Sequence, residues 1–231
     1  MSETRAATVC ACCRAGLVVG PEFAFCPACG FIATDPAEAV DHIEALRQRL
    51  ASSTTGEINL DVPNALATLT EGAWWELCGG RGAHFTAGSL TRFVRMLGLG
   101  VTTLSVTVDG RRALLKATRA AAPARLSFDL EDDLTAVAMA VEAFPSAMER
   151  QVARWRRVIG ELLNDGQRVA ICGAEPIAKA FLSRLQIDQT RLVQVMDASC
   201  PPDVVIALVD AAADVRRRLQ ELGLRPLVLT P

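Results

Sequence analysis

Five cysteines lie within the first thirty residues of this chain, and their spacing indicates a metal site. Two residues separate Cys10 from Cys13, and two residues separate Cys26 from Cys29. A two-residue gap lets both thiolates of a pair turn toward one ion, and two such pairs complete a tetrahedral shell. We therefore predict a structural Zn²⁺ ion held by these four cysteines, with no open coordination position for catalysis.

Two alternatives to this assignment remain open. Cys12 lies between the predicted ligands and could take the place of Cys13, although its spacing is less favourable. The cysteines could also be reduced core residues, but that interpretation does not explain two matched gaps. The twelve residues between Cys13 and Cys26 are enough for a short hairpin that pairs 17–19 with 23–25.

A second candidate site follows from short apolar strands that alternate with helices after residue 166. Strands are expected at 168–172, 192–196, 204–209 and 226–229, with helices at 176–185 and 211–222. This alternation predicts a small parallel sheet covered by helices on both faces. Gly173 and Glu175 stand at the first strand-to-helix turn and Asp197 ends the second strand, where dinucleotide folds hold phosphate and ribose. Because one glycine stands where three are expected, a tight structural turn is favoured over ligand binding.

The elements that must position these residues can be located from helix caps, apolar periodicity and turn residues. Asp35 and Pro36 open a helix that runs to about Leu50, and a linker follows at 52–56. Further along, we expect a strand at 57–62, one helix from Asn64 to about Trp74-Trp75, and a helix at 87–97 that is capped by Thr86. A hairpin should follow, with strands at 101–108 and 111–118 and a turn at Asp109-Gly110. Two helices, at 133–144 and 146–163, should be separated by Pro145. The two tryptophans are equally well explained as core residues or as an exposed apolar surface.

Composition excludes several classes of protein. The chain has 231 residues, 24 basic and 26 acidic side chains, and 51% hydrophobic residues, so it can bury a core. The near-neutral net charge of −2 argues against nucleic-acid binding by phosphate neutralisation. No apolar run is long enough to cross a bilayer, and the first residues do not read as a secretory signal. We therefore expect a cytoplasmic protein with no nucleic-acid or membrane partner.

The order of these parts resembles a known family. A four-cysteine module precedes Asp61-Val-Pro-Asn64, Phe85-Thr86-Ala-Gly-Ser-Leu90, a hairpin, a long helix and a terminal lobe that opens with "RVAICGA". This arrangement resembles the zinc-containing sugar C-methyltransferases, which act on nucleotide-linked deoxysugars. The resemblance implies an N-terminal zinc module, a central class I S-adenosylmethionine (SAM) domain and a C-terminal Rossmann-like domain. It also makes Asn64 a candidate ligand-binding residue and a nucleotide sugar a candidate ligand.

Two departures from the family pattern bear on activity. The SAM-binding half should lie between the zinc module and residue 61, where only one helix and a short linker are found. The family's acid/base Glu and His positions are Gly80 and Arg81 here, and its final Tyr position is His84. Neither Gly nor an always-charged Arg can remove a proton from a sugar carbon. His84 is thus the weak catalytic candidate that remains, although a lone histidine at a helix start more often caps or packs.

The sequence therefore predicts an α/β protein with four segments: a zinc-ribbon-like module (1–34), a helix and linker (35–56), a remnant of a class I methyltransferase sheet (57–125), and long helices with a Rossmann-like parallel lobe (126–231). We expect a methyltransferase-like protein without a SAM site, a pseudoenzyme that assists a protein partner or forms a homodimer in a sugar or natural-product pathway. The alternatives are an isomerase- or cyclase-type enzyme that acts on a small ligand in the relic cleft through His84, and a C-methyltransferase subunit completed by another chain.

Overall fold

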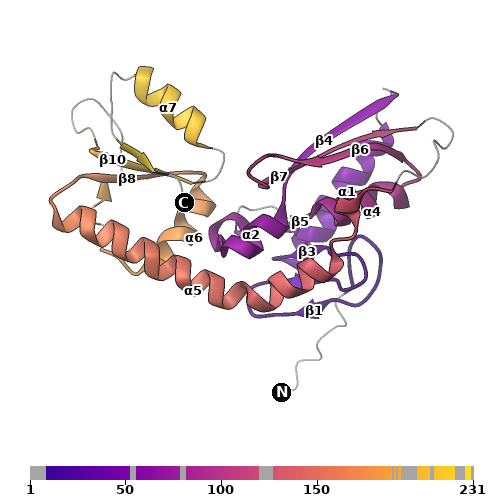
Figure 1. The fold of residues 1–231 in the computed structure, drawn as a ribbon, viewed down its shortest axis with the longest axis horizontal. Helices are drawn as coiled ribbons and strands as arrows, with labels where there is room; N and C mark the ends of the chain where they lie inside the picture. Colours follow the sequence, from indigo (N-terminus) through magenta and orange to yellow (C-terminus); the bar gives the residue numbers. More distant parts are fainter. Residues whose placement is uncertain are drawn as a thin grey trace. The chain divides into compact units, whose positions relative to one another are not determined.

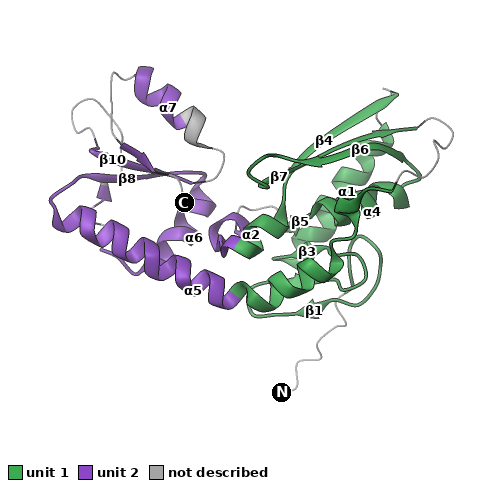
Figure 2. Cartoon of the chain, viewed as in Figure 1, with its two compact units in different colours: residues 1–70, 81–144 green, residues 71–80, 145–231 purple. Residues whose placement is uncertain are grey.

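The computed structural model describes residues 9–52, 56–78, 82–119, 127–188, 190, 192–193, 202–208, 211–221 and 227–229. The fold is mixed α/β, and the chain divides into two compact units (Figure 2). Unit 1 comprises residues 1–70 and 81–144, and unit 2 comprises residues 71–80 and 145–231. The four segments expected from the sequence are therefore distributed over two units.

The N-terminal part of unit 1 is a small antiparallel sheet. It contains β1 (Val18–Val19), β2 (Ala24–Phe25), β3 (Ile32–Ala33) and β5 (Ala83–His84), in the order β1-β2-β3-β5 (Figure 1). The predicted hairpin before the second cysteine pair is confirmed by the pairing of β1 with β2. The fourth strand comes from a segment fifty residues further along the chain, which no local sequence signal indicates.

Helix α1 (Pro36–Ser52) begins where the sequence predicts. The Asp35 carboxylate accepts hydrogen bonds from the backbone amides of Ala37 and Glu38 at 2.8 and 3.1 Å, which satisfies two otherwise unpaired donors of the first turn. The helix approaches the residues before β5 closely at Gly82, which has a φ of +51°. A Cβ atom at Gly82 would lie 2.6 Å from Glu38 Cβ, so only glycine permits this approach.

A three-stranded antiparallel sheet forms the other part of unit 1. Its strands β4 (Glu57–Pro63), β6 (Gly100–Val106) and β7 (Arg112–Thr118) lie in the order β4-β7-β6. The predicted two-residue turn at Asp109-Gly110 is wrong, because the Thr107 amide donates to the Arg112 carbonyl across a four-residue loop. The Asp109 carboxylate holds this longer loop by accepting from the Thr107 hydroxyl and the Arg111 amide.

Helix α4 (Ala87–Met96) connects the two sheets of unit 1 through one apolar core. The Thr86 side chain caps α4 and, with Ser89, forms a reciprocal capping box. The buried face of α4 packs against β6 and β7. The same continuous core includes the N-terminal cysteines together with residues of α1 and β4, so the cysteine-rich segment is part of the unit's interior.

The single helix expected after Asn64 is wrong. The structure contains α2 (Ala65–Glu71) and a short α3 (Trp74–Leu77), with a break at Gly72, which has a φ of +73°. A Cβ atom at Gly72 would lie 2.4 Å from the carbonyl carbon of Ala147. Glycine at this position therefore allows a close contact with a helix that is distant in the sequence. The positive φ that it adopts interrupts the helix expected from Asn64 to Trp74-Trp75.

The predicted helix stop at Pro145 is also wrong. A short 3-10 turn η1 (Asp129–Glu131) precedes one long helix, α5 (Leu134–Asn164), and Pro145 lies inside it. Proline removes one helical hydrogen bond, at a cost of about 3 kcal/mol. The buried side chains of Val137, Phe144 and Met148 continue at helical spacing across the proline, and this burial offsets the cost. Gly166, with a φ of +75°, ends the helix as predicted.

Unit 2 contains the parallel sheet expected from the sequence. Its strands are β8 (Val169–Cys172), β9 (Leu192–Val193), β10 (Val204–Ala207) and β11 (Leu227–Leu229), and all pairs are parallel in the order β11-β10-β8-β9. Helix α7 (Ala211–Glu221) covers one face, while α6 (Glu175–Leu185) and the second part of α5 lie on the other (Figure 1).

An aromatic cluster forms the centre of the unit 2 core. The Phe181 ring on α6 stacks on Trp74 at 5.7 Å and meets Trp75 and Trp155 edge-on at 5.2 and 5.8 Å. All four side chains are buried. Of the two explanations for Trp74-Trp75, the structure supports a core role.

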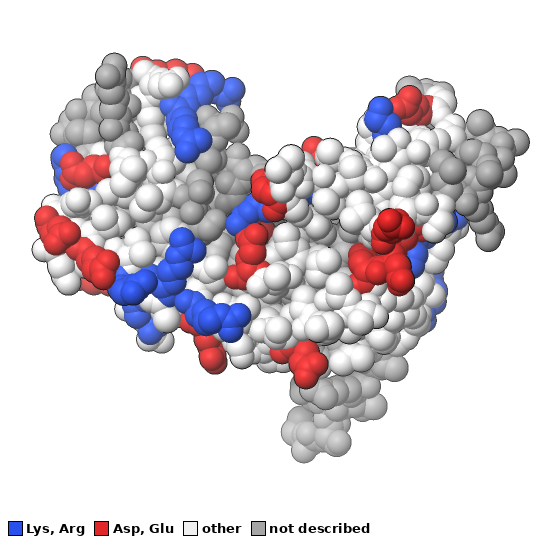
Figure 3. All heavy atoms as spheres, viewed as in Figure 1, with Lys and Arg blue, Asp and Glu red and all other residues white. Residues whose placement is uncertain are grey.

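The surface of α5 in unit 2 carries exposed arginines. They are Arg150, Arg154, Arg156 and Arg157, and Figure 3 shows basic side chains along this helix with acidic groups nearby. Arg156 donates to the backbone carbonyl oxygens of Arg184 and Leu185 and so satisfies the C-terminal end of α6.

Within the described ranges, the structure contains no helix with both the length and the apolar character needed to traverse a bilayer.

Candidate metal centre and ligand groove

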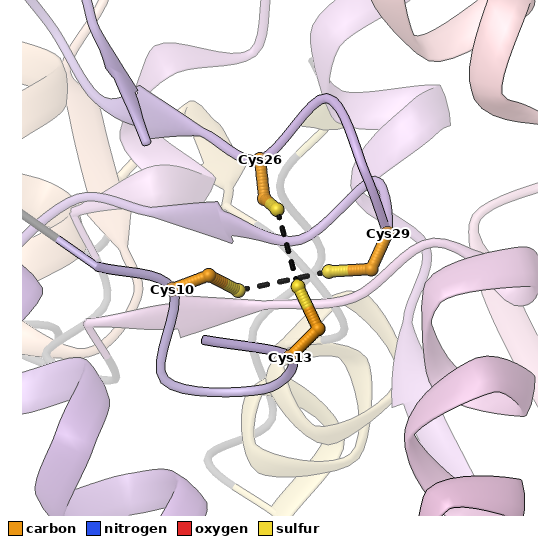
Figure 4. Close-up of side chains that lie close together, drawn as sticks. All are labelled: Cys10, Cys13, Cys26 and Cys29. Carbon is orange, nitrogen blue, oxygen red and sulfur yellow. Dashed lines mark hydrogen bonds between the residues drawn. The ribbon is translucent and has the colours of Figure 1, made fainter. Parts of the chain in front are cut away.

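Four cysteine side chains from two loops converge on one point in unit 1 (Figure 4). Cys10 and Cys13 lie in the turn before β1, and Cys26 and Cys29 lie in the turn between β2 and β3. Their sulfur atoms all lie within 4.8 Å of one another. The sequence thus located the cluster correctly, and Cys13, not Cys12, completes it.

The geometry of these sulfur atoms fits a tetrahedral metal ion. The Sγ atoms of Cys10 and Cys29 lie 3.6 Å apart, and those of Cys13 and Cys26 lie 3.5 Å apart. Metal–sulfur bonds of about 2.3 Å in a tetrahedron require sulfur atoms about 3.8 Å apart. A disulfide would bring a pair to about 2.05 Å, so the cysteines are thiols arranged around a common centre. The four cysteines can therefore hold a metal ion.

Electrostatics give a physical reason for a cation at this position. Hydrogen bonds from the thiols of Cys12 and then Cys29 lower the pKa of Cys10, and their bonds to Cys10 raise the pKa of both partners. Burial raises the pKa of Cys26 to about 11. The cluster alone thus favours one thiolate over four, because buried negative charges repel one another. A bound cation offsets the repulsion between the thiolates, so that all four sulfur atoms can coordinate it.

Two arginines hold the metal-binding loops from the helices behind them. On α1, the Arg47 guanidinium donates to the carbonyl oxygens of Ala11 and Cys12 at 3.3 and 3.1 Å. On α4, the Arg92 guanidinium donates to the Cys29 carbonyl at 3.0 Å and pairs with the buried Asp133. These contacts orient the ligand loops and place positive charge beside a cluster of thiolates.

The metal centre is connected through the backbone to a groove in the same unit. Strand β3 follows Cys29 within three residues and pairs with β5, with Ile32 opposite His84. The His84 Nε2 atom lies 3.2 Å from the Thr34 hydroxyl just beyond β3. The loop that supplies two ligands therefore also positions the histidine that the sequence singled out.

This groove, which we call the α1–β4 groove, has a volume of about 460 Å³. One side is formed by α1 between His42 and Arg49, and the other by Asp61–Pro63 at the end of β4 and by residues 83–85. Small-molecule sites have volumes of about 300–1,000 Å³, with mostly apolar walls and a few polar groups. Apolar side chains such as Leu46, Val62 and Phe85 form most of this wall, and the polar groups are His42, Arg49, Asp61 and His84.

Two segments that lie far apart in the sequence meet at this groove. The segments Asp61–Asn64 and Phe85–Leu90 carry the family resemblance, and both reach the groove or its border. Asn64 and Phe85 form an isolated parallel bridge that joins the two segments, and the amide of the next residue, Ala65, donates to the Phe85 carbonyl at 2.8 Å. The sequence does not predict His42 and Arg49 as site residues. A polar residue on the exposed face of an amphipathic helix has the same local pattern whether it binds a ligand or only contacts solvent.

Asn64 has a structural position beside the groove. Its side-chain amide donates to the Gly110 carbonyl at 2.8 Å, and its side-chain oxygen accepts from the Leu66 amide at the start of α2. Both ends of this buried side chain are therefore engaged within the protein.

The other candidate ligand residues lie in unit 2 and outside this groove. Gly173 follows β8, and its Cα faces Leu208 so closely that an added Cβ would lie 3.1 Å from the Leu208 Cβ. Glu175 at the start of α6 pairs with Lys179 at 2.6 Å, and this contact lowers the pKa of the Glu175 carboxyl group. A negative charge at this helix start is unfavourable for binding a phosphate there. Asp197 lies outside the described residues.

Comparison with known proteins does not assign this chain to a family. No protein-family model matches it, and a search of curated proteins finds no significant match.

Proposed function

We propose that this protein is a zinc-containing, methyltransferase-like protein that does not methylate alone and that binds a small ligand in the α1–β4 groove. The observation that carries the proposal is that both histidines of the chain line one cavity with both segments of the family-like motif. Two histidines in 231 residues would rarely meet in one groove by chance. Imidazole groups bind polar ligand atoms and can exchange protons near neutral pH.

Zinc is the metal that the donor set favours. Four cysteine thiolates in a tetrahedral arrangement are the usual ligands of structural zinc, and four protein ligands leave no position for substrate. In this proposal the metal orders the strand that carries His84, and the chemistry of binding belongs to the groove. Elemental analysis of the purified protein should give about one Zn per chain.

The arrangement of parallel strands supports the proposal that the chain does not use SAM alone. Among the described residues, the named strands pair in parallel only in unit 2, and unit 1 has one parallel contact, the isolated bridge between Asn64 and Phe85. The sheet β4-β7-β6, which corresponds to the methyltransferase sheet in this proposal, contains no parallel strand pair and so lacks the turn between parallel strands and a helix that holds nucleotide-like cofactors. Calorimetric titration with SAM should give no binding, and micromolar binding would overturn this part of the proposal.

The groove itself can be tested with histidine NMR. In protein labelled with ¹³C-histidine, only His42 and His84 give ring signals, and His42→Gln and His84→Gln assign them. A library of small polar organic fragments should contain compounds that shift both signals together with a common affinity. If no fragment shifts either signal, the groove is not a ligand site and the proposal fails.

A second candidate function, assistance to a partner chain, is favoured by the free edge of β4. Among the described residues β4 pairs only with β7, and its register directs the backbone groups of Asn59 and Asp61 away from β7. Such an edge can pair with a strand of another protein. Asn59→Pro removes a donor from this edge without removing a β4–β7 hydrogen bond. If the edge is used, affinity capture from the native host should recover a SAM-binding chain with the unmodified protein and lose it with this variant.

A further inference from the structure

We infer that the α1–β4 groove selects small molecules with an apolar body and one anionic headgroup, a carboxylate or a phosphate, which Arg49 binds. This inference rests on the proposed ligand-binding function and adds the chemical class of the ligand. It depends on three features of the groove: its charge balance, the spacing of its polar groups along α1, and its apolar wall.

The charge balance of the groove is positive where a ligand can reach it. Asp61 is already neutralised, because the Arg112 Nε atom donates to its carboxylate at 2.7 Å. Arg49 forms no ion pair with any residue that the structure describes, and its exposed side chain lines the groove. A guanidinium group without an acidic partner binds carboxylates and phosphates by charge-assisted hydrogen bonds.

The acidic residues of α1 do not cancel this charge within the groove. Glu44 lines a different hollow on α1 and accepts a hydrogen bond from Gln48. Asp41 and Glu38 are not part of the groove wall. An anion at Arg49 therefore meets one unpaired positive group and no unpaired carboxylate of the lining.

The polar groups of α1 are spaced for a ligand with two different ends. His42 and Arg49 are seven residues apart on one face of the helix, which separates their Cα atoms by about 10 Å. Leu46 lies between them on the same face, opposite Val62 and Phe85 across the cavity. A ligand that places its headgroup at Arg49 thus lays an apolar body over Leu46 and extends toward His42.

The test compares three molecules of one shape and different charge. Benzoate, benzamide and benzamidine carry a negative, a neutral and a positive group on the same ring. We expect benzoate to shift the His42 and His84 ring signals of the metal-loaded full-length protein with an affinity at least about tenfold above benzamide. Benzamidine should bind more weakly than benzamide. Phenyl phosphate as a fourth probe shows which of the two headgroups, carboxylate or phosphate, the groove binds more tightly.

Variants locate the charge that makes the difference. Arg49→Gln should abolish the preference for benzoate over benzamide, so that the two affinities agree within about twofold. Lys116→Gln is the matched control, because Lys116 carries the same charge, is exposed in the same unit, and does not line the groove. Tryptophan fluorescence and the dispersion of the histidine signals show that each variant is folded.

The outcomes separate this inference from the proposal on which it rests. Equal binding of benzoate and benzamide, or a preference for benzamidine, overturns the inference and leaves a ligand-binding groove. A preference for benzoate that survives Arg49→Gln also overturns it, because another group then binds the anion. If none of the four probes and no library fragment binds, both the inference and the proposed function fail.

Discussion

The two units of this protein are stabilised by different means. Unit 1 surrounds a four-cysteine centre with short antiparallel strands, and arginines from α1 and α4 hold its metal-binding loops. Unit 2 is a parallel sheet between helices, centred on Phe181 and the three tryptophans. Unit 1 therefore adds specific polar contacts and a candidate metal centre to its apolar core, whereas an aromatic cluster forms the centre of unit 2. Loss of the metal should therefore affect unit 1, and loss of core volume around Phe181 should affect unit 2.

The sequence provides a separate spectroscopic reporter for each unit. All three tryptophans belong to unit 2, and both histidines belong to unit 1. Tryptophan fluorescence therefore follows one unit, and histidine NMR follows the other. The predictions below run from the largest expected effect to the smallest, and the first two use both signals.

Removal of the metal should have the largest effect. Structural zinc contributes about 10 kcal/mol or more in small domains, comparable with the whole stability of a typical domain, about 5–15 kcal/mol. Chelation, or Cys26→Ser, should collapse both histidine signals toward random-coil positions while the tryptophan emission maximum stays unchanged. Cys12→Ser should keep the metal and serves as the control. A parallel loss of both signals on chelation would show that the units do not respond separately.

Loss of core volume in unit 2 should come next. Phe181 is fully buried against three indole rings, so Phe181→Ala should destabilise the unit by about 3–5 kcal/mol. Chemical denaturation followed by tryptophan fluorescence should show this change, while the histidine signals keep their native dispersion. Phe181→Leu should cost distinctly less, because it leaves a smaller cavity. Equal costs for the two variants would contradict a role in packing.

Disruption of the Arg92–Asp133 pair should weaken unit 1 by a moderate amount. The buried Asp133 carboxylate accepts from the Gly88 amide at 2.8 Å and from the Arg92 guanidinium at 2.5 Å. Asp133→Ala leaves both donors without this acceptor and should cost about 2 kcal/mol, a value reduced for the partial exposure of Arg92. Chemical denaturation followed by histidine NMR measures this loss of unfolding free energy. Asp132→Ala, at the exposed neighbouring position, should have little effect, and a similar loss there would point to general helix-end charge instead.

The smallest effect should come from the exposed Arg168–Asp203 pair in unit 2. Hydrogen bonds from the Arg168 side chain lower the pKa of Asp203 to about 2. A lowered native pKa stabilises the fold above the unfolded-state pKa of about 3.9, and this contribution is lost as the pH falls through about 2. Asp203→Asn should slightly lower the thermal midpoint at pH 7, and the difference should disappear below pH 2.

Asp165→Asn provides the matched control for this pH dependence, because Asp165 is also exposed in unit 2. It should leave the midpoint unchanged at every pH. A difference between Asp203→Asn and the unmodified protein that persists below pH 2 would show that the effect does not arise from ionisation.

Features with a local chemical cause could be predicted from the sequence. The spacing of the cysteine pairs located the candidate metal cluster, because two cysteines with two residues between them can face one side of a turn. The cap at Asp35 and the capping box at Thr86 located two helix starts, because these side chains satisfy amides only a few residues away. Short apolar strands between helices predicted the parallel sheet of unit 2.

Features that depend on distant contacts could not be predicted in this way. Gly72 interrupts a helix because it touches Ala147, and Pro145 remains inside α5 because buried residues on both sides of it form one apolar stripe. In each case local propensity is worth about 1–3 kcal/mol, and the burial gained by packing is larger. Sequence signals for helix ends therefore fail where a second element packs against the helix.

The sequence thus determines which functional groups and local elements this protein has, and the tertiary structure determines where they lie. The chain's own residue types and spacing indicate a four-cysteine cluster that can hold a metal ion and a parallel α/β segment, because these follow from chemistry within a few residues. Tertiary structure alone brings β5 beside β3, fifty residues earlier in the chain, and places His84 and His42 in the lining of one groove. No local pattern encodes such a pairing, since its free energy comes from a core that exists only when the unit is folded.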